Sequence, residues 1–353
     1  MLENGTEQYI NIYRAIVVLL SIVFIIGKPF KSSVSNSNVF ASLVLLFTGL
    51  FFGLRPINVG TDTPHYADGF DRISRIQSLN DFFQEDHKDL LFNLIMYLFT
   101  RIGEVQLFFL FISLLTSCFF YHYIKLLTGK GLLFKSNLLP LFLVLMFSFP
   151  NMYCNVIRSG LAMPLMLISS YYLFERRVDK MLFWGITAVL CHQSVVIPIA
   201  FLLLITYFNK IKMLWYYILY IIVGFLSIMG VGIHNLLAGF NINRMSTYLT
   251  GGTDYSIGFR PDFFVFNTFF ILVFICFRKS GIKYYDYYLK FFILNSLLFF
   301  MWFHIPYSDR IGLFSWTIIP ILLVLLLQGV SIQYKRILSF LIFIGLVIVS
   351  AIL

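Results

Sequence analysis

Long, uninterrupted runs of apolar residues are the feature that most limits what this chain can fold into. Several of them approach the roughly 20 residues that a helix needs to cross the hydrocarbon core of a bilayer. Of the 353 residues, 59% are hydrophobic and only 12% are charged, whereas soluble domains carry about a quarter charged residues. These values exclude a soluble domain, a secreted disulfide scaffold and a disordered chain. Because the runs do not alternate, an outer-membrane β-barrel is excluded too.

The apolar runs predict an all-α, polytopic integral membrane protein with about 10–12 transmembrane helices. Residues 182–208 are long for one helix and short for two, and a polar His-Gln-Ser sequence at 192–194 interrupts them. We therefore predict two short helices that meet at this break. Residues 89–102 are apolar for only about a dozen residues, so we predict an interfacial or re-entrant helix there. The other spans are predicted near residues 9–27, 38–54, 105–127, 137–150, 156–174, 213–230, 261–277, 285–303, 311–329 and 337–352.

The distribution of lysine and arginine predicts the orientation, because cytoplasmic loops carry an excess of both. With 182–208 as a hairpin and 89–102 on one side, 16 of the 26 cations fall on one face, which is then cytoplasmic. Both termini and the two longest hydrophilic segments, 55–88 and 231–260, are external. We expect one transmembrane domain over 1–353 with these two external loops. The net charge of +10 does not indicate nucleic acid, since it resides in short loops.

The cations of the external face differ in type from those of the cytoplasmic face. Nine of the ten are arginine, against four arginines among the sixteen inside. A guanidinium grips phosphate oxygens in a bidentate manner, whereas lysine acts as a point charge. The pattern favours capture of a phosphorylated ligand. Pairing of the arginines with acidic residues of the same face is the alternative.

The densest polar segment runs from Arg55 through Gly60 and Asp62 to Tyr66. Gly60 permits a tight turn, and Thr63 before a proline is typical of a helix N-cap. The helix that follows places apolar and polar residues on opposite faces, so we predict a short amphipathic helix on the membrane surface. Asp62, at its entrance, is either held by the turn or a functional carboxylate.

Two further polar groups stand where apolar helices begin or break. Arg158 follows Asn155 at the outer start of a span. A charged side chain there costs insertion free energy, so its presence indicates a functional site. His192 interrupts the 182–208 segment and is either a core histidine or a site residue. Arg244 and Arg310 complete the outer set. No metal-ligand cluster, phosphate-binding glycine loop or dinucleotide fingerprint is present, so we predict no metal and no cofactor.

These motifs follow one another in an order that resembles the EpsG-type (Wzy-like) polysaccharide polymerases. The resemblance rests on Arg55…Gly60-Thr61-Asp62…Tyr66, Lys88-Asp89-Leu-Leu-Phe92, Ile157-Arg158-Ser-Gly-Leu-Ala162 and Cys191-His192-Gln-Ser194, and it covers about the first 210 residues. Beyond them only Arg244…Tyr248 and Arg310 look similar. Asp89 stands where the family more often has Glu followed by Pro, and Ser159 replaces a common Gln, which puts most doubt on the role of Asp89.

The resemblance implies a glycosyltransferase that polymerises O-antigen, capsule or exopolysaccharide on the outer face of the bacterial plasma membrane. Such an enzyme moves a growing glycan from undecaprenyl pyrophosphate onto a lipid-linked repeat unit, without a nucleotide sugar. Its partners would be lipid-linked oligosaccharide and membrane lipid; whether a chain-length regulator binds is left open. A flippase or transporter of lipid-linked oligosaccharide is the alternative, although it would need charges at mid-depth of the membrane.

The roles expected from this reading divide the polar residues into two groups. The catalytic residues would be Arg158, which stabilises the leaving pyrophosphate, and Asp62 or His192, which accepts the proton of the attacking hydroxyl. The choice between these two bases stays open, with a slight preference for Asp62. The substrate-binding residues would be Arg55, Tyr66, Asp89, Arg244 and Arg310.

Overall fold

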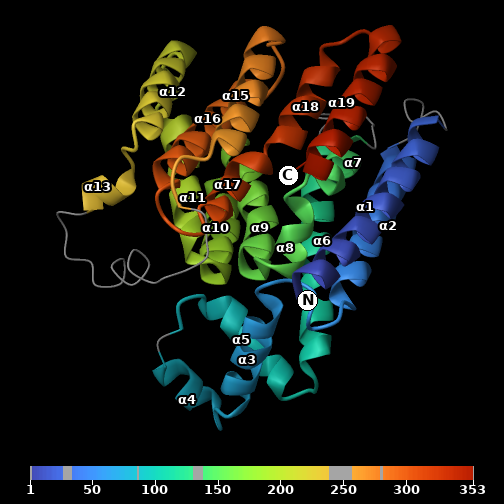
Figure 1. Cartoon of the computed structure of the whole chain (residues 1–353), viewed down its shortest axis with the longest axis vertical. Coiled ribbons are helices and arrows are strands. Elements are labelled where there is room, and N and C mark those ends of the chain that lie inside the picture. The colour runs from blue at the N-terminus through green and yellow to red at the C-terminus, as the bar shows by residue number, and fades with distance from the viewer. Residues whose placement is uncertain are drawn as a thin grey trace. The chain divides into compact units, whose positions relative to one another are not determined.

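The computed structural model describes residues 2–26, 34–85, 87–129, 138–237, 257–278 and 281–352, and all the regular secondary structure in these ranges is helical (Figure 1). The chain divides into two compact units. One consists of Met1–Ile199 together with Val330–Leu353, and the other of Ala200–Gly329. Each unit is described by itself below. The fold is that of an all-α membrane protein.

Long helices form the body of the first unit, and the short helices α3, α4 and α5 lie at the end where α1 begins and α2 ends (Figure 1). Helix α2 packs against α6, and α9 packs against both α6 and α10. Helix α7 contacts α1 and α19, so the last helix of the chain returns to the first unit. The bounds are α1 Leu2–Ile26, α2 Val34–Gly53, α3 Thr63–Ser74, α4 Leu79–Gln84, α5 Leu90–Thr100, α6 Val105–Gly129, α7 Leu138–Leu145, α8 Phe149–Cys154, α9 Ile157–Phe174, α10 Val178–Cys191, the 3-10 helix η2 Gln193–Val195, and α19 Ile332–Ile352.

The second unit is organised around α16, which packs against α12, α15, α17 and α18. Its interior is aromatic, and a buried polar contact in it is satisfied: the indole N–H of Trp316 donates to Asn267 at 3.1 Å. Helix α11 begins in the first unit and continues into this one. The bounds are α11 Val196–Tyr207, α12 Met213–Ile228, α13 Ile233–Leu237, α15 Pro261–Cys276, α16 Tyr285–Trp302, α17 Asp309–Trp316 and α18 Ile319–Gln328.

Three helical segments of the described ranges are long and apolar enough to cross a membrane: Val105–Gly129, Asp309–Gln328 and Tyr334–Ile352. Five shorter apolar helices of 10–17 residues accompany them: Asn38–Gly53, Leu90–Thr100, Gln193–Tyr207, Met213–Ile228 and Pro261–Cys276. The count of 10–12 spans stays a prediction. Helix α5 has 11 residues, which is too short to cross a bilayer in helical form.

The predicted polar break in 182–208 is confirmed. Helix α10 ends at Cys191, and His192 has an extended backbone with φ −158° and ψ 113°. The 3-10 helix η2 follows and leads into α11. Two predicted spans are also broken in the structure: 137–150 falls into α7 and α8, and a turn at 317–318 separates α17 from α18.

A short amphipathic helix, α3, forms where the sequence predicts one; its place on the outer membrane surface stays a prediction. Phe70 and Ile73 are buried on one face, whereas the opposite face is exposed at residues 65, 68, 72 and 75. Burial of the apolar face fixes the rotation of α3 about its own axis. The short helix α4, which the sequence pattern did not predict, has a capping box: Ser78 accepts from the Asp81 N–H, and Asp81 accepts from the Ser78 N–H.

The close approach of α8 to α9 depends on Gly160. A Cβ atom at this position would lie 2.0 Å from the carbonyl oxygen of Met152, which is far inside van der Waals contact. Gly160 therefore lets the first turn of α9 lie directly against α8. Arg158 belongs to that same turn, so this contact also fixes the position of the Arg158 backbone.

We expect Gly160→Ala to lower the melting temperature of the purified protein in detergent, because the new methyl group forces α8 and α9 apart. Gly69→Ala in α3 is the matched control, since a Cβ there meets nothing within 4 Å and alanine favours a helix by about 1 kcal/mol over glycine. A Gly160→Ala protein as stable as the Gly69→Ala protein would contradict the account of this packing.

Candidate functional site

A buried carboxylate, Asp89, joins three elements of the first unit. Its Oδ2 accepts from Nη1 of Arg158 at 2.7 Å and lies 3.3 Å from Nδ1 of His192. Its Oδ1 accepts from the backbone N–H of Gln193 at 3.0 Å. Asp89 occupies the N-cap position of α5, but its side chain does not cap that helix. The carboxylate instead connects α5 to the start of α9 and to the α10–η2 break.

The three ionisable side chains of this cluster differ in exposure. The Asp89 side chain is 4% exposed, whereas Arg158 is 34% and His192 is 22% exposed. The acid therefore lies beneath a basic surface that a ligand can reach. Because the carboxylate is already held by its neighbours, the exposed parts of Arg158 and His192 remain available to an anionic or hydroxylated substrate.

The ionisation of Asp89 follows from its contacts. Burial alone would raise the pKa of this carboxyl, but the hydrogen bond and charge of His192, the Gln193 N–H and the charge of Arg158 hold it below its ordinary value. Hydrogen bonds to the charged form of a carboxyl and a nearby cation both favour ionisation. Asp89 is therefore an anion at neutral pH and a poor proton acceptor.

His192 is oriented by the same carboxylate. An ionised carboxylate only accepts hydrogen bonds, so Nδ1 of His192 carries the proton in this contact. In the neutral ring the lone pair then resides on Nε2. This arrangement of an acid behind a histidine fixes the tautomer and the ring direction, and it leaves Nε2 as the basic atom.

Arg158 also contacts the aromatic ring of Tyr66 in α3, which packs in turn on α5. Its guanidinium carbon lies 5.7 Å from the centre of the Tyr66 ring, within the range of a cation–π contact. The Tyr66 ring in turn lies 6.0 Å from that of Phe92. One nitrogen of the guanidinium, Nε, is buried and has no hydrogen-bond partner among the residues that the structure describes. An arginine with an unused donor is suited to a further acceptor such as a phosphate oxygen.

The turn before α3 is anchored by Arg55, which is only 1% exposed. Its Nη1 donates to the carbonyl of Phe52 at 2.7 Å, and its Nη2 donates to the hydroxyl oxygen of Thr63 at 3.2 Å. The guanidinium also lies 4.8 Å from the centre of the Phe109 ring. These contacts give Arg55 a structural part in holding the turn; its direct contact with a ligand stays a prediction.

Gly60 brings this turn against the α8–α9 junction. Its φ is +97°, and a Cβ there would lie 2.7 Å from the carbonyl oxygen of Cys154, so only glycine fits without strain. The neighbouring Thr61 N–H donates to the side chain of Asn155 at 2.8 Å, and the Thr63 hydroxyl contacts the Cys154 carbonyl at 2.9 Å. The turn and the start of α9 are therefore one connected structure.

Asp62 follows directly and occupies the N-cap position of α3, at the helix entrance where the sequence places it. Its side chain is half-buried and does not cap the helix. Thr63, which the sequence pattern predicts as the N-cap, is the first residue of α3 instead, and its hydroxyl is turned inward toward Arg55. The contacts of Arg158 and His192 are with Asp89, so the structure gives no preference to Asp62 as the base.

The predicted site residues thus fall into distinct places. Asp89, Arg158, His192 and Tyr66 come together from α3, α5, α9 and the α10–η2 break. Arg310 belongs to the second unit, where its guanidinium lies 4.6 Å from the centre of the Tyr307 ring. Arg244 lies outside the described residues, as does most of the 231–260 loop. Among the described residues, no group of three or more His, Cys, Asp or Glu side chains is placed to hold a metal ion.

Three groups that support the site or the turn beside it were not given that role from the sequence. The Gln193 N–H and the hydroxyl of Thr63 act through contacts between distant parts of the chain, which no local pattern reveals. Phe92, within the quoted Lys88–Phe92 motif, supports the Tyr66 ring from α5. A polar residue next to a helix break was the only signal available for Gln193.

The structure places the protein among all-α membrane proteins. Its apolar helices bring an arginine, a histidine and a buried carboxylate together in one polar site. The chain matches the EpsG family over residues 38–353 and belongs to that family. The match extends well beyond the first 210 residues that carry the motifs. The family makes this a membrane protein of polysaccharide metabolism. No curated protein and no solved structure matches the chain.

The contacts of Asp89 predict a pH-dependent contribution to stability. The ordinary pKa of the carboxyl is 3.8, and the pKa of Asp89 in the folded protein is lower. At a pH above 3.8 the ionised carboxylate therefore stabilises the folded state. This contribution is lost as the pH falls through the lowered value. We expect the melting temperature of the wild type to exceed that of Asp89→Asn at pH 6–8 by an amount that shrinks below about pH 4.

Asp68→Asn, on the exposed face of α3, is the control for this measurement and should follow the wild type at each pH. A difference between wild type and Asp89→Asn that stays constant down to about pH 3 would contradict the ionised state assigned to Asp89.

Proposed function

We propose that this protein is a polysaccharide polymerase that transfers a growing glycan from a lipid diphosphate, undecaprenyl pyrophosphate, to a lipid-linked repeat unit. The observation that carries the proposal is the Asp89 cluster, in which one buried carboxylate positions both a phosphate-binding group and a base. Membership of the EpsG family supports the same reading. The partners are lipid-linked oligosaccharide and membrane lipid.

Arg158 is proposed to hold the diphosphate. Its Nη1 donates to Asp89, which fixes the plane of the guanidinium, while the buried Nε has no partner in the described part of the chain. A fixed cation directed at the leaving group stabilises the negative charge that develops as the bond breaks. Arginines can in this way supply what a divalent ion supplies in other enzymes, and no cofactor is proposed.

His192 is proposed to be the base. The acceptor sugar hydroxyl attacks the anomeric carbon of the glycan, a new carbon–oxygen bond forms, and the bond from that carbon to the diphosphate oxygen breaks. The proton of the hydroxyl passes to Nε2 of His192, and the diphosphate leaves with the electron pair. Asp89 stabilises the imidazolium so formed, through the contact with Nδ1. Asp62, at the entrance of α3, stays the alternative base.

The remaining predicted residues are proposed to bind the sugar or the lipid diphosphate. The Tyr66 ring offers a flat surface for a sugar ring, next to the guanidinium of Arg158. Arg55, Arg244 and Arg310 stay candidates for diphosphate contacts, although Arg55 is buried. The proposed location is the bacterial plasma membrane, with the site on the outer face, because the cytoplasmic loops carry most of the lysines. The rival proposal is a flippase for the same lipid.

Activity of two variants tests the proposed roles. We expect Arg158→Lys and His192→Gln each to lower the rate of polymer formation by about 10²–10⁴-fold, because lysine cannot reproduce the planar guanidinium and glutamine cannot accept the proton. The measurement is the ladder of chain lengths made by purified protein from a lipid-linked repeat unit. Asp62→Asn should retain more activity than His192→Gln.

Arg72→Lys, on the exposed face of α3, is the matched control and should give wild-type ladders. The opposite order of Asp62→Asn and His192→Gln would assign the base to Asp62. Wild-type ladders from Arg158→Lys would show that Arg158 does not make the proposed diphosphate contact. If the folded wild-type protein makes no ladder from the lipid-linked repeat unit, the flippase is favoured.

Labelling in whole cells tests the orientation. In a protein that lacks the four native cysteines, a cysteine at Ser74 should react with an impermeant thiol reagent, because α3 is predicted to lie outside. A cysteine at Asp179, in the first turn of α10 and on the predicted cytoplasmic side, should react only after the cells are opened. Both residues are exposed in the structure, so equal labelling in intact cells would overturn the orientation.

A further inference from the structure

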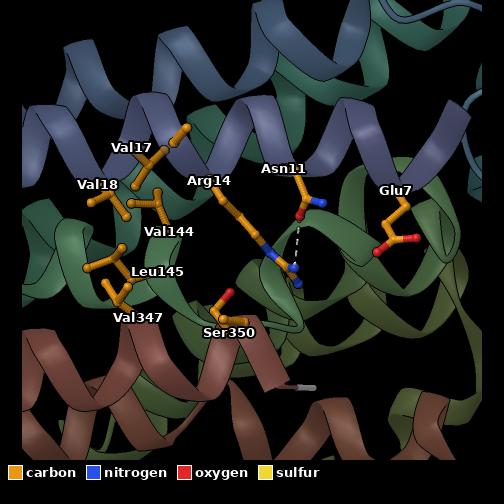
Figure 2. Close-up of a pocket in the computed structure, with 11 residues that line it drawn as sticks. Glu7, Asn11, Arg14, Val17, Val18, Val144, Leu145, Val347 and Ser350 are labelled. Atoms are coloured by element: carbon orange, nitrogen blue, oxygen red, sulfur yellow. Dashed lines mark hydrogen bonds between the residues drawn. The ribbon is translucent and has the colours of Figure 1, made fainter. Parts of the chain in front are cut away.

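A second polar feature of the first unit lies away from the Asp89 cluster, in a pocket of about 400 Å³ between α1, α7 and α19 (Figure 2). Its lining is divided in two. Charged and polar side chains of α1 lie toward the beginning of that helix, and aliphatic side chains occupy the other end, as Figure 2 shows. The polar residues are Glu7, Asn11, Arg14 and Ser350, and the aliphatic ones include Val17, Val18, Val144, Leu145 and Val347.

Arg14 is the residue that needs an explanation. It lies within the first predicted span, where an unpaired charge costs roughly 2.5–3.5 kcal/mol at mid-membrane and less near the interface. Its Nη1 donates to Asn11 in a long contact of 3.4 Å, and its Nε is buried with no hydrogen-bond partner among the described residues. The guanidinium thus keeps donors that the described residues do not use.

Glu7 supplies an opposite charge to the same pocket. Among the described residues no ion pair joins Glu7 to Arg14, and Figure 2 shows Asn11 between them along α1. An open hollow beside this end of the pocket is lined by Glu7, Gln8 and Asn11 together with Ile12 and Ala15. The pocket therefore presents a cation and an anion that are separated by a gap, followed by an aliphatic wall.

We infer that this pocket binds the phosphoethanolamine headgroup of a membrane phospholipid. The phosphate would accept from Arg14 and Asn11, the primary ammonium would donate to the Glu7 carboxylate, and the start of an acyl chain would lie against the valines. A dipolar headgroup satisfies both charges at once, whereas an anionic headgroup leaves Glu7 opposed to a negative group. This site is independent of the proposed polymerase reaction.

Binding of three lipids to the purified full-length protein tests the inference. The probes are dioleoyl phosphatidylethanolamine, phosphatidylglycerol and phosphatidylcholine in detergent, with binding followed by native mass spectrometry and by the shift in melting temperature. We expect phosphatidylethanolamine to bind most tightly. The quaternary ammonium of phosphatidylcholine has no N–H to donate, and loss of a charge-assisted hydrogen bond corresponds to about ten- to a hundredfold weaker binding.

Variants separate the two ends of the site. Glu7→Gln should remove the preference for phosphatidylethanolamine over phosphatidylcholine, and Arg14→Gln should weaken the binding of both. Arg72→Gln on α3 is the charge-matched control and should bind like the wild type. Should Arg14→Gln prove unstable, Asn11→Ala and Glu7→Gln carry the test. Equal binding of all three lipids by the wild type, or preference for phosphatidylglycerol, would overturn the inference.

Discussion

The carboxylate of Asp89 is the group on which the arrangement of the site depends. A buried negative charge is costly unless cations and hydrogen-bond donors surround it, and Asp89 obtains these from parts of the chain that lie 69 and 103 residues away. Satisfying it requires that α5, α9 and the α10–η2 break meet at one point. The same contacts keep two basic side chains from drifting apart, although each is partly open to solvent.

Around this group a second set of contacts fixes the backbone rather than the charges. The Arg55 guanidinium, the Thr63 hydroxyl and the Asn155 side chain tie the turn before α3 to the junction of α8 and α9. The site depends on these three groups even if none of them contacts a substrate. A rigid shell of this kind reduces the reorganisation that a transition state would otherwise demand.

The sequence was informative where a single helix or break determines the outcome. The apolar runs predicted the helical fold, the faces of α3 followed from their spacing, and the polar break at His192 was found at the right residue. The sequence was less informative about which distant residues contact one another. Asp89 departs from the family pattern of Glu followed by Pro, and no local sequence pattern shows that Arg158 and His192 converge on it. Arg55 was expected at a ligand, but its burial depends on Phe109 and Thr63, which the sequence does not bring together. The breaks after α7 and α17 occur within long apolar runs, and the local signal for each is a proline in the first turn of the next helix, Pro150 in α8 and Pro320 in α18.

The Gln193 N–H that donates to Asp89 belongs to the backbone, so its position cannot be adjusted by choosing another rotamer. The length of the acidic side chain at position 89 therefore sets the spacing between α5 and η2. A glutamate, with one more methylene, would have to fold back or push the two helices apart to keep the same three contacts. Within the family, the choice between aspartate and glutamate at this position should accordingly change together with the spacing of these helices, and grafting the residue alone would carry over the charge without the geometry.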